Sequence, residues 1–94
     1  MPANVLERIQ SAVRSGNYDV TKHANDEMAE DHLSIYDVEH AVLTGSISKT
    51  EHDDVRGPRS TIIGDAADEV VRVGVVGRFK ETGTFLIITV YAAD

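Results

Sequence analysis

The sequence predicts an α+β protein in which N-terminal helices pack on one face of an antiparallel β-sheet. Up to Gly45, apolar residues recur at the three- and four-residue spacing of helices. After Gly45, β-branched runs alternate with short polar turns, which is typical of strands. Helices followed by a meander of strands indicate a two-layer α+β arrangement. At 94 residues, the chain is expected to form one domain, residues 1–94, with a modest core.

Three helices and one short strand are expected in the first half of the chain. The expected bounds are 4–14, 22–31 and 35–44 for the helices and 18–21 for an edge strand. Ser34 and Asp37 have the spacing of a capping box in front of the third helix, and Gly45 ends that helix. The last two helices should pack across a face of the sheet.

Four strands are expected after Gly45, joined by polar turns. Their expected bounds are 46–51, 60–64, 70–79 and 84–91. The segment 70–79 is rich in β-branched residues and long enough for a central strand. The segment 84–91 is the most apolar, so we expect it at the centre of the sheet. Gly57 and Pro58 mark the turn in the polar loop 52–59.

The excess of acidic residues lies entirely in the helical half. The net charge is −7; residues 1–54 hold four Lys or Arg against 11 Asp or Glu, and residues 55–94 hold five of each. A general nucleic-acid binder is expected to be basic. RNA binding would therefore need a local basic patch on the sheet, whereas the acidic helices could bind a basic partner.

The composition also limits the class of protein and its location. The chain has no cysteine, which excludes disulfides and thiolate metal sites. The N-terminus carries charges where a signal peptide needs an apolar core, and no run approaches the roughly 20 apolar residues of a membrane span. These features predict a cytoplasmic protein that does not bind a membrane.

His23 is the first candidate for chemistry. A helix N-terminus disfavours protonated imidazole, so His23 could serve as a neutral base; alternatively it caps the helix or packs on the sheet. His23, Glu27 and Glu30 share one helical face and offer a weaker hypothesis, a divalent metal site. The acidic cluster of residues 52–54 is a still weaker one. We expect no metal and no cofactor.

Three arginines in the sheet half are further candidates. Arg72 interrupts the apolar run 70–76, Arg59 precedes a strand, and Arg78 lies near the end of another. If they converge on one sheet face, they form an anion site that can hold a phosphate. The alternative is that they balance the acidic helices through surface ion pairs, each worth under about 1 kcal/mol.

The order and spacing of several short motifs resemble the DUF4258 family. These motifs are Thr21-Lys22-His23-Ala24, Met28, Leu33-Ser34, Asp37-Val38, Ala41-Val42 and Gly45, then Gly57-Pro58-Arg59, Gly64 and Ile88-Thr89-Val90-Tyr91. The resemblance runs from about Tyr18 to Tyr91. It implies a RelE-like fold, the small α+β architecture of bacterial ribonuclease toxins. It also implies an antitoxin partner, of the zinc-finger type that accompanies MqsR-type toxins.

The resemblance further implies a cytoplasmic endoribonuclease that cleaves messenger RNA without a metal. A ribose 2′-hydroxyl would attack the adjacent phosphate, which requires a base, an acid and a cation. His23 would be the base or acid, and Arg59, Arg72 and Arg78 would hold the phosphate. Tyr91 would stack on a base or transfer a proton. The alternative is a non-catalytic protein-binding module, a decayed toxin that uses its acidic helical face. The oligomeric state stays open.

Overall fold

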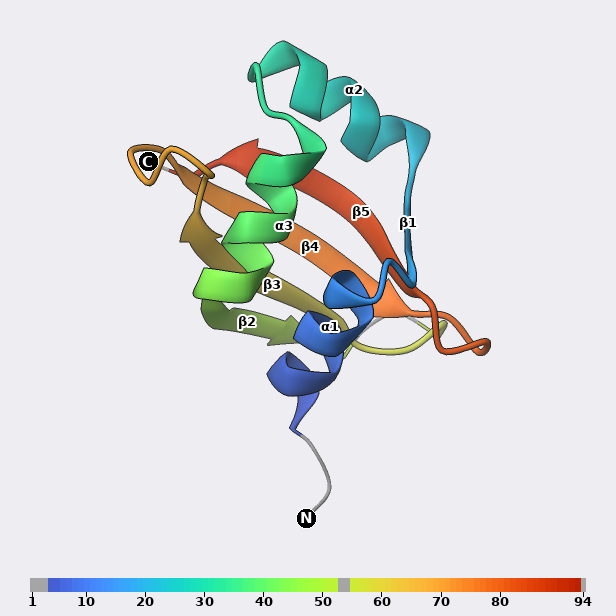
Figure 1. The fold of residues 1–94 in the computed structure, drawn as a ribbon. Helices are drawn as coiled ribbons and strands as arrows, with labels where there is room; N and C mark the ends of the chain where they lie inside the picture. The colour runs from blue at the N-terminus through green and yellow to red at the C-terminus, as the bar shows by residue number, and fades with distance from the viewer. Residues whose placement is uncertain (1–3, 53–54, 94) are drawn as a thin grey trace.

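A computed structural model describes residues 4–52 and 55–93 of the chain. The described residues form three helices and a five-stranded sheet with the strand order β1-β5-β4-β3-β2 (Figure 1). The elements are α1 (Val5–Arg14), β1 (Tyr18–Val20), α2 (Lys22–Glu30), α3 (Ile35–Thr44), β2 (Ser46–Glu51), β3 (Arg59–Asp65), β4 (Arg72–Phe79) and β5 (Phe85–Ala92). The predicted α+β class is confirmed, and each expected element is present.

The sheet is mixed, so the prediction of a wholly antiparallel sheet is wrong. Strands β2, β3, β4 and β5 form the expected antiparallel meander. Strand β1 instead pairs with β5 in parallel, with Tyr18 opposite Phe85 and Val20 opposite Ile87. Parallel neighbours need a long crossover connection. Here the connection from β1 to β5 is the whole segment that contains α2, α3, β2, β3 and β4. Strand β1 lies at the edge as expected, but β4 rather than β5 is the central strand.

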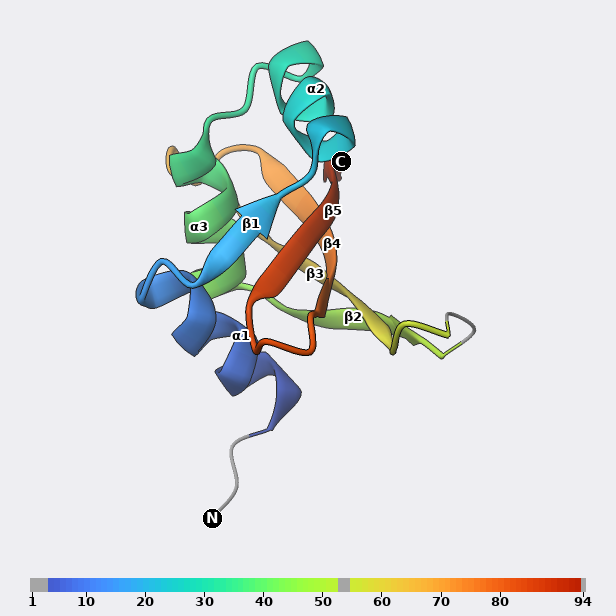
Figure 2. The ribbon, with the colours of Figure 1, turned by 90° about the vertical axis from the view of Figure 1, so that its right-hand side faces the viewer.

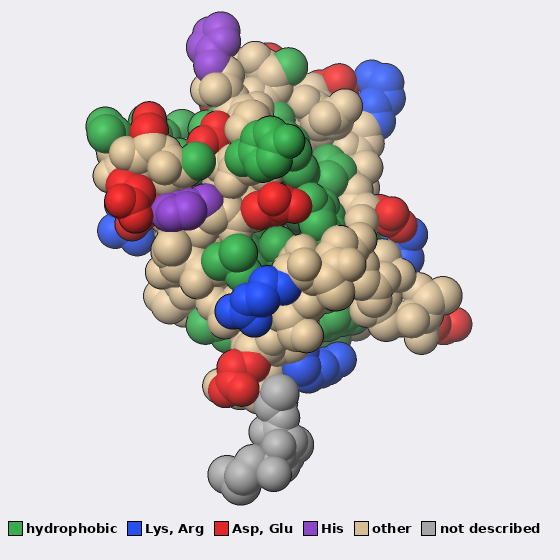
Figure 3. All heavy atoms as spheres, in the orientation of Figure 1, with side chains coloured by type: hydrophobic (Ala, Val, Ile, Leu, Met, Phe, Trp, Pro, Cys, Tyr) green, Lys and Arg blue, Asp and Glu red, His purple; other side chains and the backbone are tan. Residues whose placement is uncertain are grey.

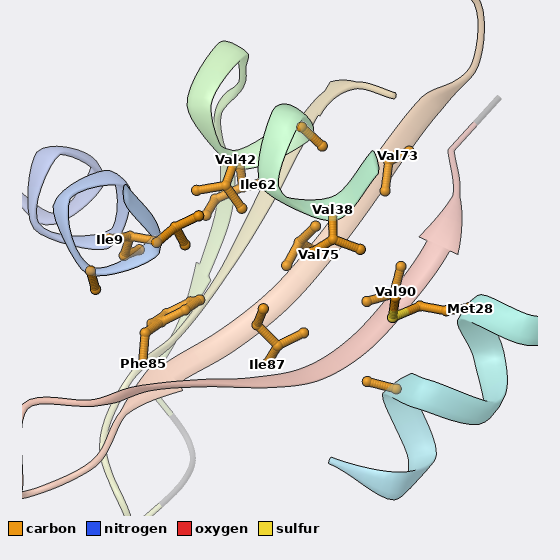
Figure 4. Packing of buried hydrophobic residues seen from close by; sticks show 14 of the residues in the cluster. Ile9, Met28, Val38, Val42, Ile62, Val73, Val75, Phe85, Ile87 and Val90 are labelled. Carbon is orange, nitrogen blue, oxygen red and sulfur yellow. The ribbon is translucent and has the colours of Figure 1, made fainter. Parts of the chain in front are cut away.

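The core lies between the helices and one face of the sheet, which we call the covered face. Strand residues at alternate positions point toward the helices there, because successive side chains of a strand lie on opposite faces. Figure 4 shows these side chains meeting those of the three helices. The labelled core residues are Ile9, Met28, Val38, Val42, Ile62, Val73, Val75, Phe85, Ile87 and Val90.

Helix α3 is held over β3 and β4 by a capping box at its start and by a close backbone contact. Ser34 accepts the Asp37 N–H at 3.3 Å, and the Asp37 carboxylate accepts the Ser34 N–H at 2.8 Å, which confirms the predicted cap. The bond from the Ser34 N–H, together with one from the Ala67 N–H, lowers the pKa of Asp37. Gly64 lies directly beneath the Ala41 backbone, where a Cβ would collide with the helix.

Helix α2 packs against the edge of β5 rather than across the sheet, so the expected arrangement of two helices across a face is confirmed for α3 only (Figures 1 and 2). Because β1 ends at Val20, the later part of β5 has no neighbouring strand on that side. Two carboxylates of α2 take the place of a strand. Glu27 accepts the Val90 N–H and Asp31 accepts the Ala92 N–H, each at 3.1 Å. These bonds satisfy backbone donors that would otherwise be unpaired.

Candidate functional site: the open face of the sheet

The face of the sheet turned away from α1 and α3 has no helix over it in the described part of the chain (Figure 2). On each inner strand, the neighbours of core residues point to this side. Most of their apolar side chains are half-buried, and none belongs to the core cluster. We call this surface the open face, and its apolar residues are Ile63, Val76, Leu86, Ile88 and Tyr91.

Two of the predicted arginines meet at one end of the open face. Ser60 lies opposite Gly77, so the next positions along β3 and β4 are Arg59 and Arg78. Arg78 also lies opposite Leu86, which places it on the open face. The Nε atom of Arg78 is buried and has no hydrogen-bond partner among residues 4–52 and 55–93. An arginine with a buried donor in this position can bind an anion.

Lys49 adds a third cation that the sequence did not suggest as part of a site. Its Nζ lies 3.9 Å from Glu51 Oε2, and Nη2 of Arg59 lies 3.4 Å from the same oxygen. Lys49 and Arg59 therefore lie near one carboxylate, Glu51, and Arg78 lies beside Arg59 on the neighbouring strand. We call Lys49, Arg59 and Arg78 the basic cluster. The bulge in β2 between Ile47 and Lys49 sets this register. A bulge is hard to detect in sequence, which explains why Lys49 was missed.

Tyr91 and Arg72 lie toward the other end of the open face. Tyr91 is opposite Gly74, and its ring lies across the Gly74 backbone, where a side chain would collide with it. Arg72 is exposed and is the first residue of β4. Since Arg72 and Arg78 are six residues apart on one strand, their backbones are separated by about 20 Å. The three arginines thus do not converge on one phosphate, although Arg59 and Arg78 do adjoin.

His23 lies at the β5 edge, in the first turn of α2. Its side chain is 67% exposed, and its Nε2 is 3.3 Å from Glu27 Oε1, the oxygen that accepts the Val90 N–H. Within the described residues, no hydrogen bond or ion pair joins His23 to Arg59, Arg72 or Arg78. Helix α2 lies beyond β5, so Arg59 on β3 is at least two strand spacings, about 10 Å, further away. His23, the expected base, therefore does not lie in one site with the arginines that were expected to hold the phosphate.

The described residues do not form the alternative metal face of His23, Glu27 and Glu30. Among residues 4–52 and 55–93, no group of three or more His, Asp or Glu side chains is placed to hold a metal ion. Glu27 is already engaged by His23 and by the β5 backbone. In the other acidic cluster, His52 is described, whereas Asp53 and Asp54 lie outside the described residues.

His40 and Tyr18 are polar residues inside the fold that serve the architecture. His40 Nδ1 lies 2.9 Å from the Asp65 carbonyl oxygen, which fixes α3 to the end of β3. The Tyr18 hydroxyl donates to the Glu39 carboxylate and so links β1 to α3. Burial, followed by this hydrogen bond, raises the pKa of Tyr18 well above its ordinary value. Both contacts face the helical side and contribute nothing to the open face.

Comparison with known proteins identifies a family and no named relative. No curated protein and no solved structure matches the chain. The described residues contain no helix that is long and apolar enough to span a membrane. The profile of a domain of unknown function, DUF4258, matches residues 20–92, a range that begins at the last residue of β1 and includes α2, α3 and strands β2 to β5. Since this match covers most of the sequence, the chain belongs to the DUF4258 family.

Proposed function

We propose that this protein is the toxin component of a bacterial toxin–antitoxin system, and that it binds messenger RNA on the open face and cleaves it without a metal. The proposal includes a RelE-like two-layer architecture, a cytoplasmic location and an antitoxin partner. One observation carries it. Arg59 and Arg78 adjoin on an uncovered sheet face that also presents an aromatic ring and half-buried apolar side chains.

This combination suits a single-stranded nucleic acid. Guanidinium groups bind phosphate through paired, charge-assisted hydrogen bonds. Bases stack on aromatic rings exposed on a sheet, and Tyr91, spread over Gly74, offers such a ring. The basic cluster supplies the local positive charge that RNA binding requires of a protein whose net charge is −7.

Cleavage would use the same face. Arg59 and Arg78 would stabilise the charge that develops on the phosphate during attack by the ribose 2′-hydroxyl. Tyr91 would stack a base or transfer a proton, and Arg72 would hold the RNA backbone at the other end of β4. His23 would act as base or acid on RNA that reaches across β5 to α2, because a catalytic group must come within hydrogen-bond distance of its proton.

The second candidate is a non-catalytic protein-binding module, a decayed toxin. The separation of His23 from the basic cluster favours it, since the groups needed for concerted proton transfer lie apart. The acidic helical face offers fewer available carboxylates to a basic partner than the sequence suggests. Glu27 and Asp31 are engaged by the β5 backbone, and the acidic side chains visible on the helical side are scattered (Figure 3).

Induced expression, combined with RNA binding in vitro, tests the proposal. We expect wild type to arrest growth and fragment total RNA, and Arg78→Gln to abolish both. Single-stranded RNA should bind Arg78→Gln about tenfold more weakly, because one set of charge-assisted hydrogen bonds is lost. Arg14→Gln, which removes an exposed charge at the end of α1, is the matched control and should behave as wild type.

Three other results would change the conclusion. RNA binding without fragmentation would retain the open face as an RNA site and remove the catalytic part of the proposal. Normal growth, intact RNA and no RNA binding by a folded protein would favour the protein-binding module. Fragmentation that persists in His23→Ala would leave His23 without a catalytic role.

A further inference from the structure

A cavity of about 260 Å³ lies beneath α1, at the end of the core nearest to the basic cluster. Its walls are largely apolar and come from α1 and from strands β2 to β5, with Ile9, Phe79 and Phe85 among the lining residues. Gly77 contributes no side chain to fill the space. Because Ile9 and Phe85 are core residues, the cavity opens on the helical side of the sheet.

The polar residues around this cavity include a cation without a carboxylate partner. Arg8 lies with its guanidinium carbon 4.6 Å from the centre of the Phe79 ring, a cation–π contact that holds the side chain in place. Within the described residues, no carboxylate pairs with Arg8. A positioned guanidinium beside an apolar cavity is a suitable receptor for a carboxylate.

Two further polar groups border the same space. Ser60 is only 5% exposed, and its hydroxyl makes no hydrogen bond within the described part of the chain. His52 lies at the rim and can donate from a ring nitrogen. The Ser60 hydroxyl therefore has unused hydrogen-bonding capacity for a ligand.

We propose that this cavity binds a small organic carboxylate with an apolar body, such as an aromatic or branched-chain acid. The carboxylate contacts Arg8 and accepts hydrogen bonds from Ser60 or His52, while the body packs against Ile9, Phe79 and Phe85. Small-molecule sites typically combine apolar walls with a few polar groups of this kind. This site is independent of RNA binding, although Arg78 borders the cavity as well as the open face.

The size of the cavity favours a free small molecule over a peptide. An apolar cavity of about 150 Å³ holds a benzene molecule. A cavity of about 260 Å³ therefore holds one ring with a short acidic chain, but not several residues of a peptide. The acidic balance of the protein disfavours anions elsewhere on its helical half, so Arg8 gives this position a distinct specificity.

An NMR titration of the whole chain with 3-phenylpropionate tests the inference. We expect saturable shifts of the backbone amides of Ile9, Gly77 and Phe85. The neutral amide 3-phenylpropanamide has nearly the same shape and should bind at least about tenfold more weakly, because it loses the charge-assisted bonds. Propionate, which lacks the ring, should bind weakly as well, because it buries little apolar surface.

Variants locate the carboxylate. Arg8→Gln should weaken 3-phenylpropionate binding about as much as the neutral amide does, whereas Arg14→Gln on the same helix should leave it unchanged. Equal affinity for acid and amide in the wild-type protein would overturn the inference, whether or not Arg8→Gln folds. So would an absence of saturable shifts, or shifts confined to Lys49 and Arg59, which do not line the cavity and would place the anion on the open face instead.

Discussion

The two faces of the sheet use similar residues under different physical constraints. Ile62 and Ile63 are neighbours on β3, yet Ile62 is fully buried against the helices, whereas Ile63 is half-buried on the open face. The same holds for Ile87 and Ile88 on β5. On the covered face, apolar side chains fill space between packed elements. On the open face, they are half-buried beside charged and aromatic side chains such as Arg78 and Tyr91, and this is the face to which we assign RNA binding as a proposal.

The largest expected effect on stability comes from truncating Ile62 on the covered face, compared with Ile63 on the open face. Ile62→Ala should lower the free energy of unfolding by about 2–5 kcal/mol, because the lost methyl groups leave a cavity in the core. Ile63→Ala should cost less than half as much, since the side chain is partly solvated in the folded state. Urea denaturation of both variants measures the difference. Equal costs would mean that the open face is packed as tightly as the covered one.

Glycines on the two faces offer a second contrast. Gly64→Ala should destabilise by about 1–3 kcal/mol, because the new methyl group meets the backbone of α3 at Ala41, which cannot move alone. The atoms nearest to a new methyl group at Gly74 belong to the Tyr91 ring, which can swing into solvent, so Gly74→Ala should cost less than about 1 kcal/mol. Thermal unfolding measures both. If Gly74→Ala is the more harmful variant, the Tyr91 ring is anchored rather than free.

Along the later part of β5, the side chains of α2 rather than a neighbouring strand accept the backbone N–H groups. Glu27→Ala should cost about 1–3 kcal/mol, because it leaves the buried Val90 N–H without its acceptor. Hydrogen exchange at Val90 should accelerate in this variant. Glu30→Ala, on the exposed side of the same helix, should change stability by no more than about 0.5 kcal/mol. Unchanged exchange at Val90 would show that the packing of α2 and the core protects this edge without the carboxylate.

The smallest expected effect concerns pH and the cap of α3, the helix that covers the sheet. The pKa of Asp37 is lowered in the folded protein, chiefly by the Ser34 N–H. Its contribution to stability is therefore complete above the unfolded pKa, about 3.9, and is lost as pH falls through the folded pKa. We expect Asp37→Asn to be less stable than wild type at neutral pH and equal to it in acid. A stability difference that persists in acid would exclude the charge as its cause.

Elements held by local interactions were predictable from the residues alone. The helix bounds followed from capping residues and apolar periodicity, signals that involve residues only a few positions apart, such as Ser34 and Asp37. The meander from β2 to β5 followed in the same way, because consecutive strands joined by short turns pair with each other. The candidate arginines were also identified from sequence, through their positions in strands or directly before one.

Contacts between distant segments required the folded chain. The parallel pairing of β1 with β5 joins Tyr18 to Phe85, and nothing near Tyr18 in the sequence indicates that partner. The sequence offered Glu27 as part of a metal-binding face with His23 and Glu30, whereas in the fold Glu27 accepts the Val90 N–H and Asp31 accepts the Ala92 N–H. The strand order likewise placed Arg59 beside Arg78, whereas Arg72 and His23 lie away from that pair. Local free energies determine which elements form, whereas the closing of long loops around a shared core determines which elements become neighbours.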